Sequence, residues 1–363
     1  MRLVKSFCSL RIFALLIAFS GATWAQGTND LPSAPSSVNQ PKAAPKPVAP
    51  PAPPPEDAPS SGSSTAGSDS VANAADERSS DLVDQGGTTI RVPVNEVSVV
   101  FTVTDKHNHY VKDLTRKDFV VLDDQQPVVN FRSFRRETDL PLQVGLLIDA
   151  SNSIRDRFKF EQESAIEFLN QTVRPKYDQA FVIGFDISPE VTQDFTDNTD
   201  ALAQGVRALR PGGGTAMYDA LYFASRDKLL KSQQSSSVRR AIIIVSDGDD
   251  NSSHVTREEA IEMALRANTI VYTISTNFPS GGGGDKVLQR IADATGGRAF
   301  QPFQLSDVSN AFAQIQDDLR SQYELSYRPE NFAHDGRYRT IAINALHKGL
   351  RVRSRSGYYA PVQ

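Results

Sequence analysis

The chain has 363 residues, with 39 Lys and Arg against 43 Asp and Glu, and it contains a single cysteine. The net charge of −4 argues against a protein that coats nucleic acid, because no basic excess is available to neutralise phosphates. One cysteine cannot form an internal disulfide, so a disulfide scaffold and a cysteine-rich zinc site are excluded. Of the 21 prolines, 11 lie within residues 32–59, which indicates segments of different physical character.

Residues 1–25 are typical of a secretory signal peptide. Basic residues flank an apolar run at 12–19, and the sequence Thr-Trp-Ala ends at Ala25, where small residues favour cleavage. The apolar run is shorter than the roughly 20 residues of a membrane span, which favours cleavage over retention as a short anchor. Cleavage removes the cysteine and takes the net charge from −4 to −7. We therefore expect an exported bacterial envelope protein, periplasmic or extracellular, that does not span the membrane after cleavage.

Residues 26–88 are rich in Pro, Ala, Ser and Gly and contain no aromatic residue. Such a segment cannot bury enough apolar surface to offset the entropy of ordering it. The sequence therefore predicts a disordered linker, extended in its proline-rich part. It would hold a folded region away from a surface.

Two short β-rich modules are predicted at 89–137 and 321–363. Both have period-two, β-branched segments separated by polar turns. Because three strands alone would leave bare edges, the two modules are expected to pair as one small β-sandwich, with two independent β appendages as the alternative. The expected strands cover 94–104, 119–122, 128–134, 323–327, 338–345 and 350–355.

Between these modules, residues 138–320 alternate apolar strands with amphipathic helices. The runs at 142–148 and 241–245 are almost wholly apolar, as expected of strands that are buried on both faces. The pattern predicts an α/β fold with a doubly wound, mostly parallel, Rossmann-like sheet, inserted into or flanked by the sandwich. Further strands are expected at 180–185, 191–195, 269–275 and near Ala299, with helices at 158–173, 200–209, 217–230, 256–267, 286–294 and 305–319.

Polar side chains follow two of the buried strands. Asp149, Ser151 and Ser153 come directly after the first strand, and Asp247 follows the strand at 241–245. Between them, three glycines precede Thr215 in a loop that leads into a helix. In an open α/β sheet, ligands bind at the carboxyl ends of the strands. We therefore expect these groups to converge.

The converging groups are two carboxylates and three hydroxyls, without histidine or cysteine. Hard oxygen ligands of this kind suit Mg²⁺ or Mn²⁺, and Ca²⁺ less well. An ion bound by so few charged ligands keeps an open position for an external carboxylate. The sequence thus predicts metal-bridged recognition of an Asp or Glu of a protein partner, without nucleic acid. Asn152, Gly214, Asp249 and Asp250 are expected to form the rim that contacts this partner.

The sequences DASNS at 149–153, GGGT at 212–215 and SDG at 246–248 resemble the metal-ion-dependent adhesion site of von Willebrand factor type A domains. The resemblance covers about residues 139–320 and extends to a subset of bacterial secreted proteins. It implies that Ser151, Ser153 and Thr215 contact the ion, and that Asp149 and Asp247 bind it directly or through water. It also implies a binding or adhesion module that is not an enzyme.

Two other functions are compatible with parts of the sequence. In one, the metal site is vestigial and the protein is a structural spacer or assembly part of the envelope. In the other, Ser246 is the nucleophile of a serine hydrolase, although Ile244 stands where a nucleophile elbow needs glycine.

Four other patterns are weaker. Asp247, Asp249, Asn251 and Glu258 match the spacing of a Ca²⁺ loop but lack its glycine. His107 and His109 are expected in a solvated turn. The glycines at 281–284 are expected in a surface loop, because Asp285 does not fit a phosphate-binding loop. The arginines at 351, 353 and 355 are expected on one exposed strand face.

Overall fold

The computed structural model describes residues 96–136, 140–232, 238–277 and 282–362. The predicted signal peptide and the predicted linker lie outside these residues. Within the described residues, no helix is long and apolar enough to cross a membrane.

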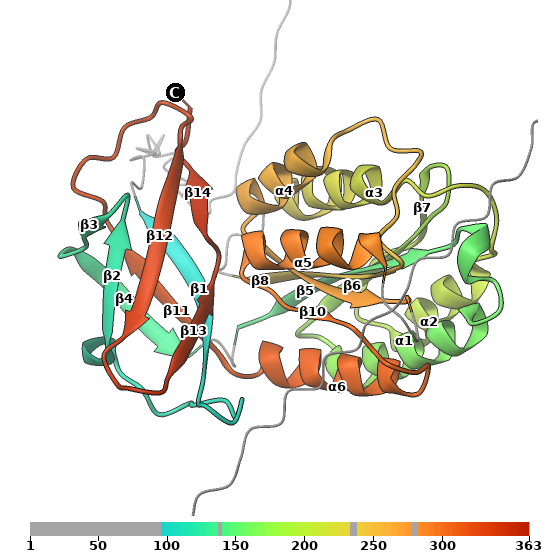
Figure 1. The fold of residues 1–363 in the computed structure, drawn as a ribbon, viewed down its shortest axis with the longest axis horizontal. Coiled ribbons are helices and arrows are strands. Elements are labelled where there is room, and N and C mark those ends of the chain that lie inside the picture. The colour runs from blue at the N-terminus through green and yellow to red at the C-terminus, as the bar shows by residue number, and fades with distance from the viewer. Residues whose placement is uncertain (1–95, 137–139, 233–237, 278–281, 363) are drawn as a thin grey trace, which may run out of the picture. The chain divides into compact units, whose positions relative to one another are not determined.

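A six-stranded sheet forms the centre of the α/β unit (Figure 1). Its order is β10-β9-β8-β5-β6-β7, and every neighbouring pair is parallel except β6 and β7. The innermost strands, β5 and β8, are buried almost throughout, which explains their nearly continuous apolar sequences. The strands are β5 (Leu142–Asp149), β6 (Gln179–Phe185), β7 (Pro189–Thr196), β8 (Arg239–Ser246), β9 (Thr269–Ser275) and β10 (Ala299–Phe300).

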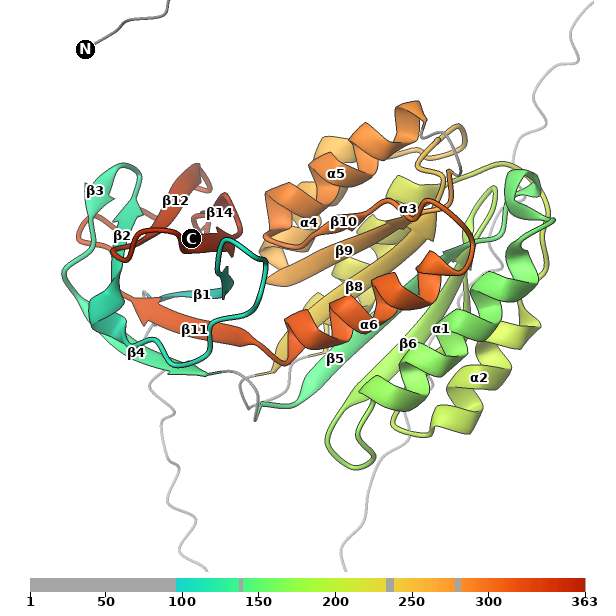
Figure 2. The same ribbon diagram turned by 60° about the horizontal axis from the view of Figure 1, so that its bottom comes forward.

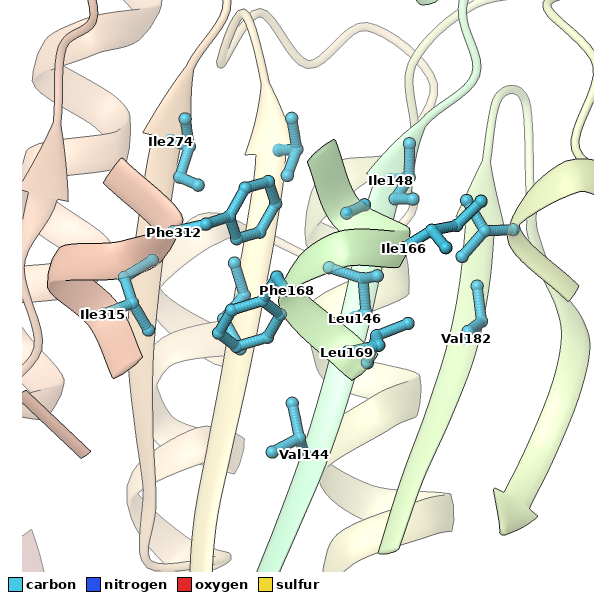
Figure 3. Packing of buried hydrophobic residues seen from close by; sticks show 14 of the residues in the cluster. Val144, Leu146, Ile148, Ile166, Phe168, Leu169, Val182, Ile274, Phe312 and Ile315 are labelled. Atoms are coloured by element: carbon cyan, nitrogen blue, oxygen red, sulfur yellow. The ribbon is translucent and has the colours of Figure 1, made fainter. Parts of the chain in front are cut away.

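Helices cover both faces of this sheet, as Figure 2 shows. One apolar core lies under α1, α2 and α6, where Phe168 of α1 stacks on Phe312 of α6 at 5.0 Å between ring centroids (Figure 3). A second core lies under the helices of the opposite face. The helices are α1 (Phe158–Thr172), α2 (Thr199–Ala208), α3 (Met217–Phe223), α4 (Arg257–Arg266), α5 (Gly283–Thr295) and α6 (Asp307–Leu319).

The helix expected at 217–230 changes its winding halfway. It is an α-helix as far as Phe223 and continues as the π-helical segment η4 (Ala224–Leu230). Short 3₁₀ turns, η1 (Arg116–Asp118) and η3 (Asn152–Ile154), precede β2 and α1. The other helices match their expected ranges to within a few residues.

Strands from both sides of the α/β unit form a sandwich of two antiparallel sheets. One sheet has the order β13-β1-β11-β4 and the other β14-β12-β2-β3, so each contains segments from before residue 137 and after residue 320. Phe101, Phe119 and Tyr323 pack between them in a shared core. The strands are β1 (Val97–Thr104), β2 (Phe119–Asp123), β3 (Gln126–Pro127), β4 (Phe131–Arg136), β11 (Gln322–Tyr327), β12 (Tyr338–Ala345), β13 (Arg351–Ser354) and β14 (Gly357–Tyr359). The expected fold class, a mostly parallel α/β sheet with an associated β-sandwich, is confirmed.

The expected exposed arginine face on β13 is wrong for two of its three members. Arg353 pairs with the buried Asp318 of α6 and donates to the Thr102 hydroxyl. Arg355 is 8% exposed, and its guanidinium donates to Asn268 Oδ1 at 2.6 Å and to the Ser98 carbonyl at 2.8 Å. These arginines instead connect the sandwich to the α/β unit.

Candidate metal centre

The predicted ligand loops meet at the carboxyl edge of the central sheet. Asp149 ends β5, and Asp247 follows Ser246, the last residue of the neighbouring β8. The loop with Thr215 runs beside them, since the Gly212 backbone N–H donates to the Ala150 carbonyl at 2.7 Å. The parallel pairing of β5 and β8 thus brings together segments about 100 residues apart.

Asp149 is completely buried, and the groups around it hold its carboxylate in a fixed orientation. Oδ1 accepts the Ser151 backbone N–H at 2.8 Å, and Oδ2 accepts the Ser246 hydroxyl at 2.7 Å. Ser246 is itself oriented by the Gly248 backbone N–H at 3.0 Å. Burial nevertheless raises the pKa of Asp149 to about 6, although these hydrogen bonds act against the rise. A cation at this carboxylate would supply the stabilisation that solvent cannot.

A chain of hydroxyls joins the β5 loop to the β8 loop. The Ser151 and Ser153 Oγ atoms are 2.9 Å apart, and Ser153 Oγ donates to Asp247 Oδ2 at 2.8 Å. The other oxygen of this carboxylate accepts the Asp249 backbone N–H at 3.1 Å. Four of the five predicted ligands therefore lie in one hydrogen-bonded group.

Thr215, the fifth predicted ligand, is 4% exposed and is positioned mainly through its backbone. Its N–H donates to Asn251 Oδ1 at 2.9 Å, and its carbonyl accepts the backbone N–H groups of Asn251 and Ser252 at 3.0 Å. The next residue, Ala216, donates its N–H to the Asp186 carbonyl at the end of β6. The Thr215 loop is thus held between the loops that follow β6 and β8.

The predicted rim residues have different surroundings. Asn152 and Asp249 are exposed, and Asn152 Nδ2 donates to the Gly213 carbonyl at 3.3 Å. Gly214 packs closely against the loop after β8, because a Cβ there would lie 2.4 Å from Ser252 Oγ. The Asp250 carboxylate already accepts the Tyr218 backbone N–H and the Ser253 hydroxyl at 2.9 and 2.7 Å. Asn152 and Asp249 are therefore the exposed side chains of the expected rim, and Arg155 and Gly213 hold the Asn152 amide in place.

The N-terminal turn of α5 packs against the loop after β8 and helps to hold it in place. Asp285 accepts the Ser275 hydroxyl at 2.5 Å and the Asn277 side-chain amide at 3.1 Å, and the same amide donates to the Asp247 carbonyl at 2.6 Å. A Cβ on Gly284 would lie only 2.0 Å from that carbonyl oxygen. Gly284 thus allows close packing against the site, a function that the sequence pattern does not reveal.

One buried carboxylate near the site was missed by the sequence reasoning. Glu161 of α1 is 1% exposed, and burial raises its pKa to about 8, with further increases from the Asp149 and Asp247 charges. Arg157 opposes this rise, with its Nε 3.6 Å from Glu161 Oε1. The sequence did contain a signal for Glu161, because it is a charged residue on the stripe of the amphipathic helix α1 that faces the core.

The residues fit a divalent cation that prefers oxygen ligands. Two carboxylates and two serine hydroxyls converge, and Thr215 lies in the adjoining loop. In the described part of the chain, no group of three or more His, Cys, Asp or Glu side chains is close enough to hold one ion. Hydroxyl ligands would therefore have to complete the coordination of a divalent cation.

The weaker patterns do not form sites. The Glu258 carboxylate accepts a hydrogen bond from Arg257, and Asn251 Oδ1 accepts one from the Thr215 backbone N–H. The residues that match a Ca²⁺ loop in sequence therefore have other partners in the fold. His107 and His109 lie in an exposed turn, where Asp105 accepts both backbone N–H groups. Ser246 is fully buried and donates its hydroxyl to Asp149, which gives it a positioning role instead of that of a nucleophile.

The family model of the von Willebrand factor type A domain matches residues 144–249, which include all five predicted ligands. The chain is 31% identical over 179 residues to calcium-activated chloride channel regulator 1 of Bos taurus. This match covers 47% of the chain but only 19% of the bovine protein, so the chain spans about a fifth of the length of this curated relative.

Solved structures give similar but more distant matches. Proximal thread matrix protein 1 from the mussel byssus is 16% identical, with a TM-score of 0.43 over 53% of this chain and 49% of that chain. Another structure of the mussel protein is described with a zinc-occupied MIDAS motif. The vWF domain of the type V pili tip protein Mfa5 from Porphyromonas gingivalis is 16% identical, with a TM-score of 0.40 over 49% of this chain and 94% of that chain.

The residues matched by the family model coincide with the strands and loops that form the candidate metal centre. Residues 144–249 run from within β5, through the Thr215 loop, to the loop after β8. The chain therefore contains a von Willebrand factor type A domain, and the matched residues include most of β5 and all of β6, β7 and β8.

Proposed function

We propose that this protein is an exported, non-enzymatic binding protein that engages a protein partner through a divalent cation. Asp149, Ser151, Ser153, Thr215 and Asp247 would hold Mg²⁺ or Mn²⁺, and an Asp or Glu of the partner would complete the coordination. The observation that carries the proposal is the hydroxyl chain from Ser151 through Ser153 to Asp247, which joins two strand ends in a single oxygen-rich group.

The cation would supply electrostatic attraction for a carboxylate that the acidic protein could not otherwise bind. The chain itself would orient the ligands, with Ser246 holding Asp149 and Asn277 holding the Asp247 backbone. The exposed Asn152 and Asp249 would contact the partner around the ion. The proline-rich segment before the folded region would act as the spacer that presents this surface.

A structural role with a vestigial metal site is the second candidate. It is favoured by the size of the sandwich and by the arginines at 353 and 355, which connect it firmly to the α/β unit. The two candidates differ in their response to metal. Partner capture from an envelope extract that survives EDTA would support the structural role, whereas capture that requires Mg²⁺ would support the proposal.

The decisive test of the metal site is thermal unfolding with and without Mg²⁺ or Mn²⁺. A ligand at about 100 times its Kd stabilises the native state by about 2.7 kcal/mol, and EDTA should abolish the effect. The Asp149→Ala variant should lose this response because its buried carboxylate orients the site. Asp156→Ala is a matched control, since Asp156 is exposed seven residues later. An unchanged metal response in Asp149→Ala would refute the assignment.

A further inference from the structure

Glu161 is a buried carboxylate without a hydrogen-bond donor. It lies on α1 with 1% of its surface exposed, and within the described residues neither carboxylate oxygen accepts a hydrogen bond. Its ion-pair contact is with Arg157, one helical turn earlier, at 3.6 Å from Nε to Oε1. Burying a charge so weakly compensated is unfavourable unless the charge serves another group.

Apart from Arg157, the charges that act on Glu161 belong to the candidate metal centre. The Asp149 and Asp247 carboxylates both raise its pKa, and only Arg157 lowers it. The helix that carries Glu161 follows directly on the loop of Asp149, Ser151 and Ser153, and it packs under β5. Glu161 is therefore a buried acidic group, on the helix after the ligand loop, that interacts electrostatically with Asp149 and Asp247.

These four groups give a simple charge balance. When ionised, the Asp149, Asp247 and Glu161 carboxylates carry three negative charges, and the Arg157 guanidinium carries one positive charge. The net value of −2 is the charge that a divalent cation neutralises. Since no three such carboxylates lie close enough to share one ion in the described part of the chain, Glu161 must act through its field and not as a ligand.

We propose that Glu161 is a positioning residue that sets the net charge of the metal centre and so raises its affinity for a divalent cation. The inference rests on the proposed function, because it assumes that the centre binds a cation at all. The inference concerns two residues outside the proposed ligand set. Glu161 raises the affinity for the cation, and Arg157 lowers it.

The test is calorimetric titration of the full chain with MgCl₂ or MnCl₂, together with thermal unfolding in EDTA. For Glu161→Gln we expect the Kd for the cation to rise by about tenfold or more, since a full charge is removed from a poorly solvated region. Above pH 8, where Glu161 is ionised even without metal, the same variant should melt at a higher temperature than the wild type in EDTA, because a weakly compensated buried charge has gone. Glu163→Gln changes an exposed carboxylate on the same helix and should alter neither quantity.

Arg157→Gln separates a charge effect from a packing effect. It takes the net charge of the centre from −2 to −3, so the Kd should fall severalfold, opposite in sign to Glu161→Gln. If the ion pair served only to hold α1 in place, both variants would change the Kd in the same direction.

The outcomes distinguish the two proposals. A wild-type protein that binds no divalent cation overturns the proposed function, and the inference falls with it. A wild-type protein that binds the cation with the same Kd as Glu161→Gln overturns the inference alone.

Discussion

The sandwich and the α/β unit each bury a carboxylate, but they surround it differently. In the sandwich, Asp123 is 6% exposed and accepts the Tyr327 and Tyr358 hydroxyls at 2.8 and 2.9 Å, with Arg339 Nη1 at 3.9 Å. In the α/β unit, Asp149 faces serines and other acids, and Glu161 has no hydrogen-bond donor within the described residues. The first carboxylate is compensated by two hydroxyl donors and an arginine, whereas Asp149 and Glu161 lie among other carboxylates, and Glu161 has the more distant Arg157 as its counter-charge at 3.6 Å.

The number of donors and counter-charges around a buried carboxylate distinguishes a structural acidic residue from one that is suited to bind a cation. A buried carboxylate with matched donors stabilises one native packing, because removing it leaves those donors unsatisfied. A buried carboxylate without them lowers stability until a cation arrives. The comparison therefore predicts that metal changes the contribution of the acidic residues at the candidate metal centre to stability, but not the contribution of Asp123 in the sandwich.

The largest expected effect is the pH dependence of the metal-free protein. The pKa of Glu161 is raised from 4.5 to about 8 and that of Asp149 from 3.8 to about 6, both mainly by burial. Between these values the folded state binds more protons than the unfolded state, so stability is present at low pH and is lost as pH rises through 6 and then 8. In EDTA, the free energy of unfolding should fall by about 6 kcal/mol from pH 4.5 to 8, with about two thirds of the loss from Glu161.

Urea denaturation at several pH values measures this loss. Saturating Mg²⁺ should reverse it, because the cation binds the deprotonated carboxylates. The slope in EDTA should be smaller in Glu161→Gln. A free energy of unfolding that is flat or rises across this range in EDTA would contradict the comparison.

The next largest effect is expected from Asp123→Ala. Two buried tyrosine hydroxyls would lose their acceptor, and Arg339, which is 6% exposed, would lose its nearby counter-charge. We expect a loss of about 3 kcal/mol in unfolding free energy. The loss should be the same in Mg²⁺ and in EDTA, as measured by urea denaturation. The exposed Asp113→Ala variant in the same sandwich is the control, and a metal-dependent loss in Asp123→Ala would remove the distinction between the two regions.

A smaller effect is expected from Gly284→Ala. Its methyl group would collide with the Asp247 carbonyl, so the β8 loop must shift, at a cost of about 2 kcal/mol and with weaker binding of Mg²⁺. Gly283→Ala is the matched control, because a Cβ there meets nothing within 4 Å. Thermal unfolding with and without Mg²⁺ compares the two variants. Equal metal responses would show that α5 does not support the site.

Much of the α/β unit follows from local pattern. The apolar runs of β5 and β8 predict strands buried on both faces, and the rule that loops at strand ends converge predicts that Asp149 and Asp247 lie close together. The hydroxyl chain through Ser151 and Ser153 agrees with that expectation. These features depend on neighbours in sequence and on the fixed direction of parallel strands.

Other features depend on contacts between distant segments, which no local pattern encodes. Arg355 has the spacing of an exposed strand residue, yet it is buried because Asn268 and Ser98 accept its hydrogen bonds. The glycine at 284 is part of a run that reads as a flexible loop, yet its lack of a side chain lets α5 approach Asp247.

Periodicity and residue chemistry are local properties, so they are sufficient to predict the alternation of strands and helices, the type A domain and a set of oxygen ligands. The pairing of two distant β segments in one sandwich and the burial of Glu161 beneath the sheet are visible only in the folded chain. Pairing partners and electrostatic fields depend on distances in space, and the folded chain alone defines those distances.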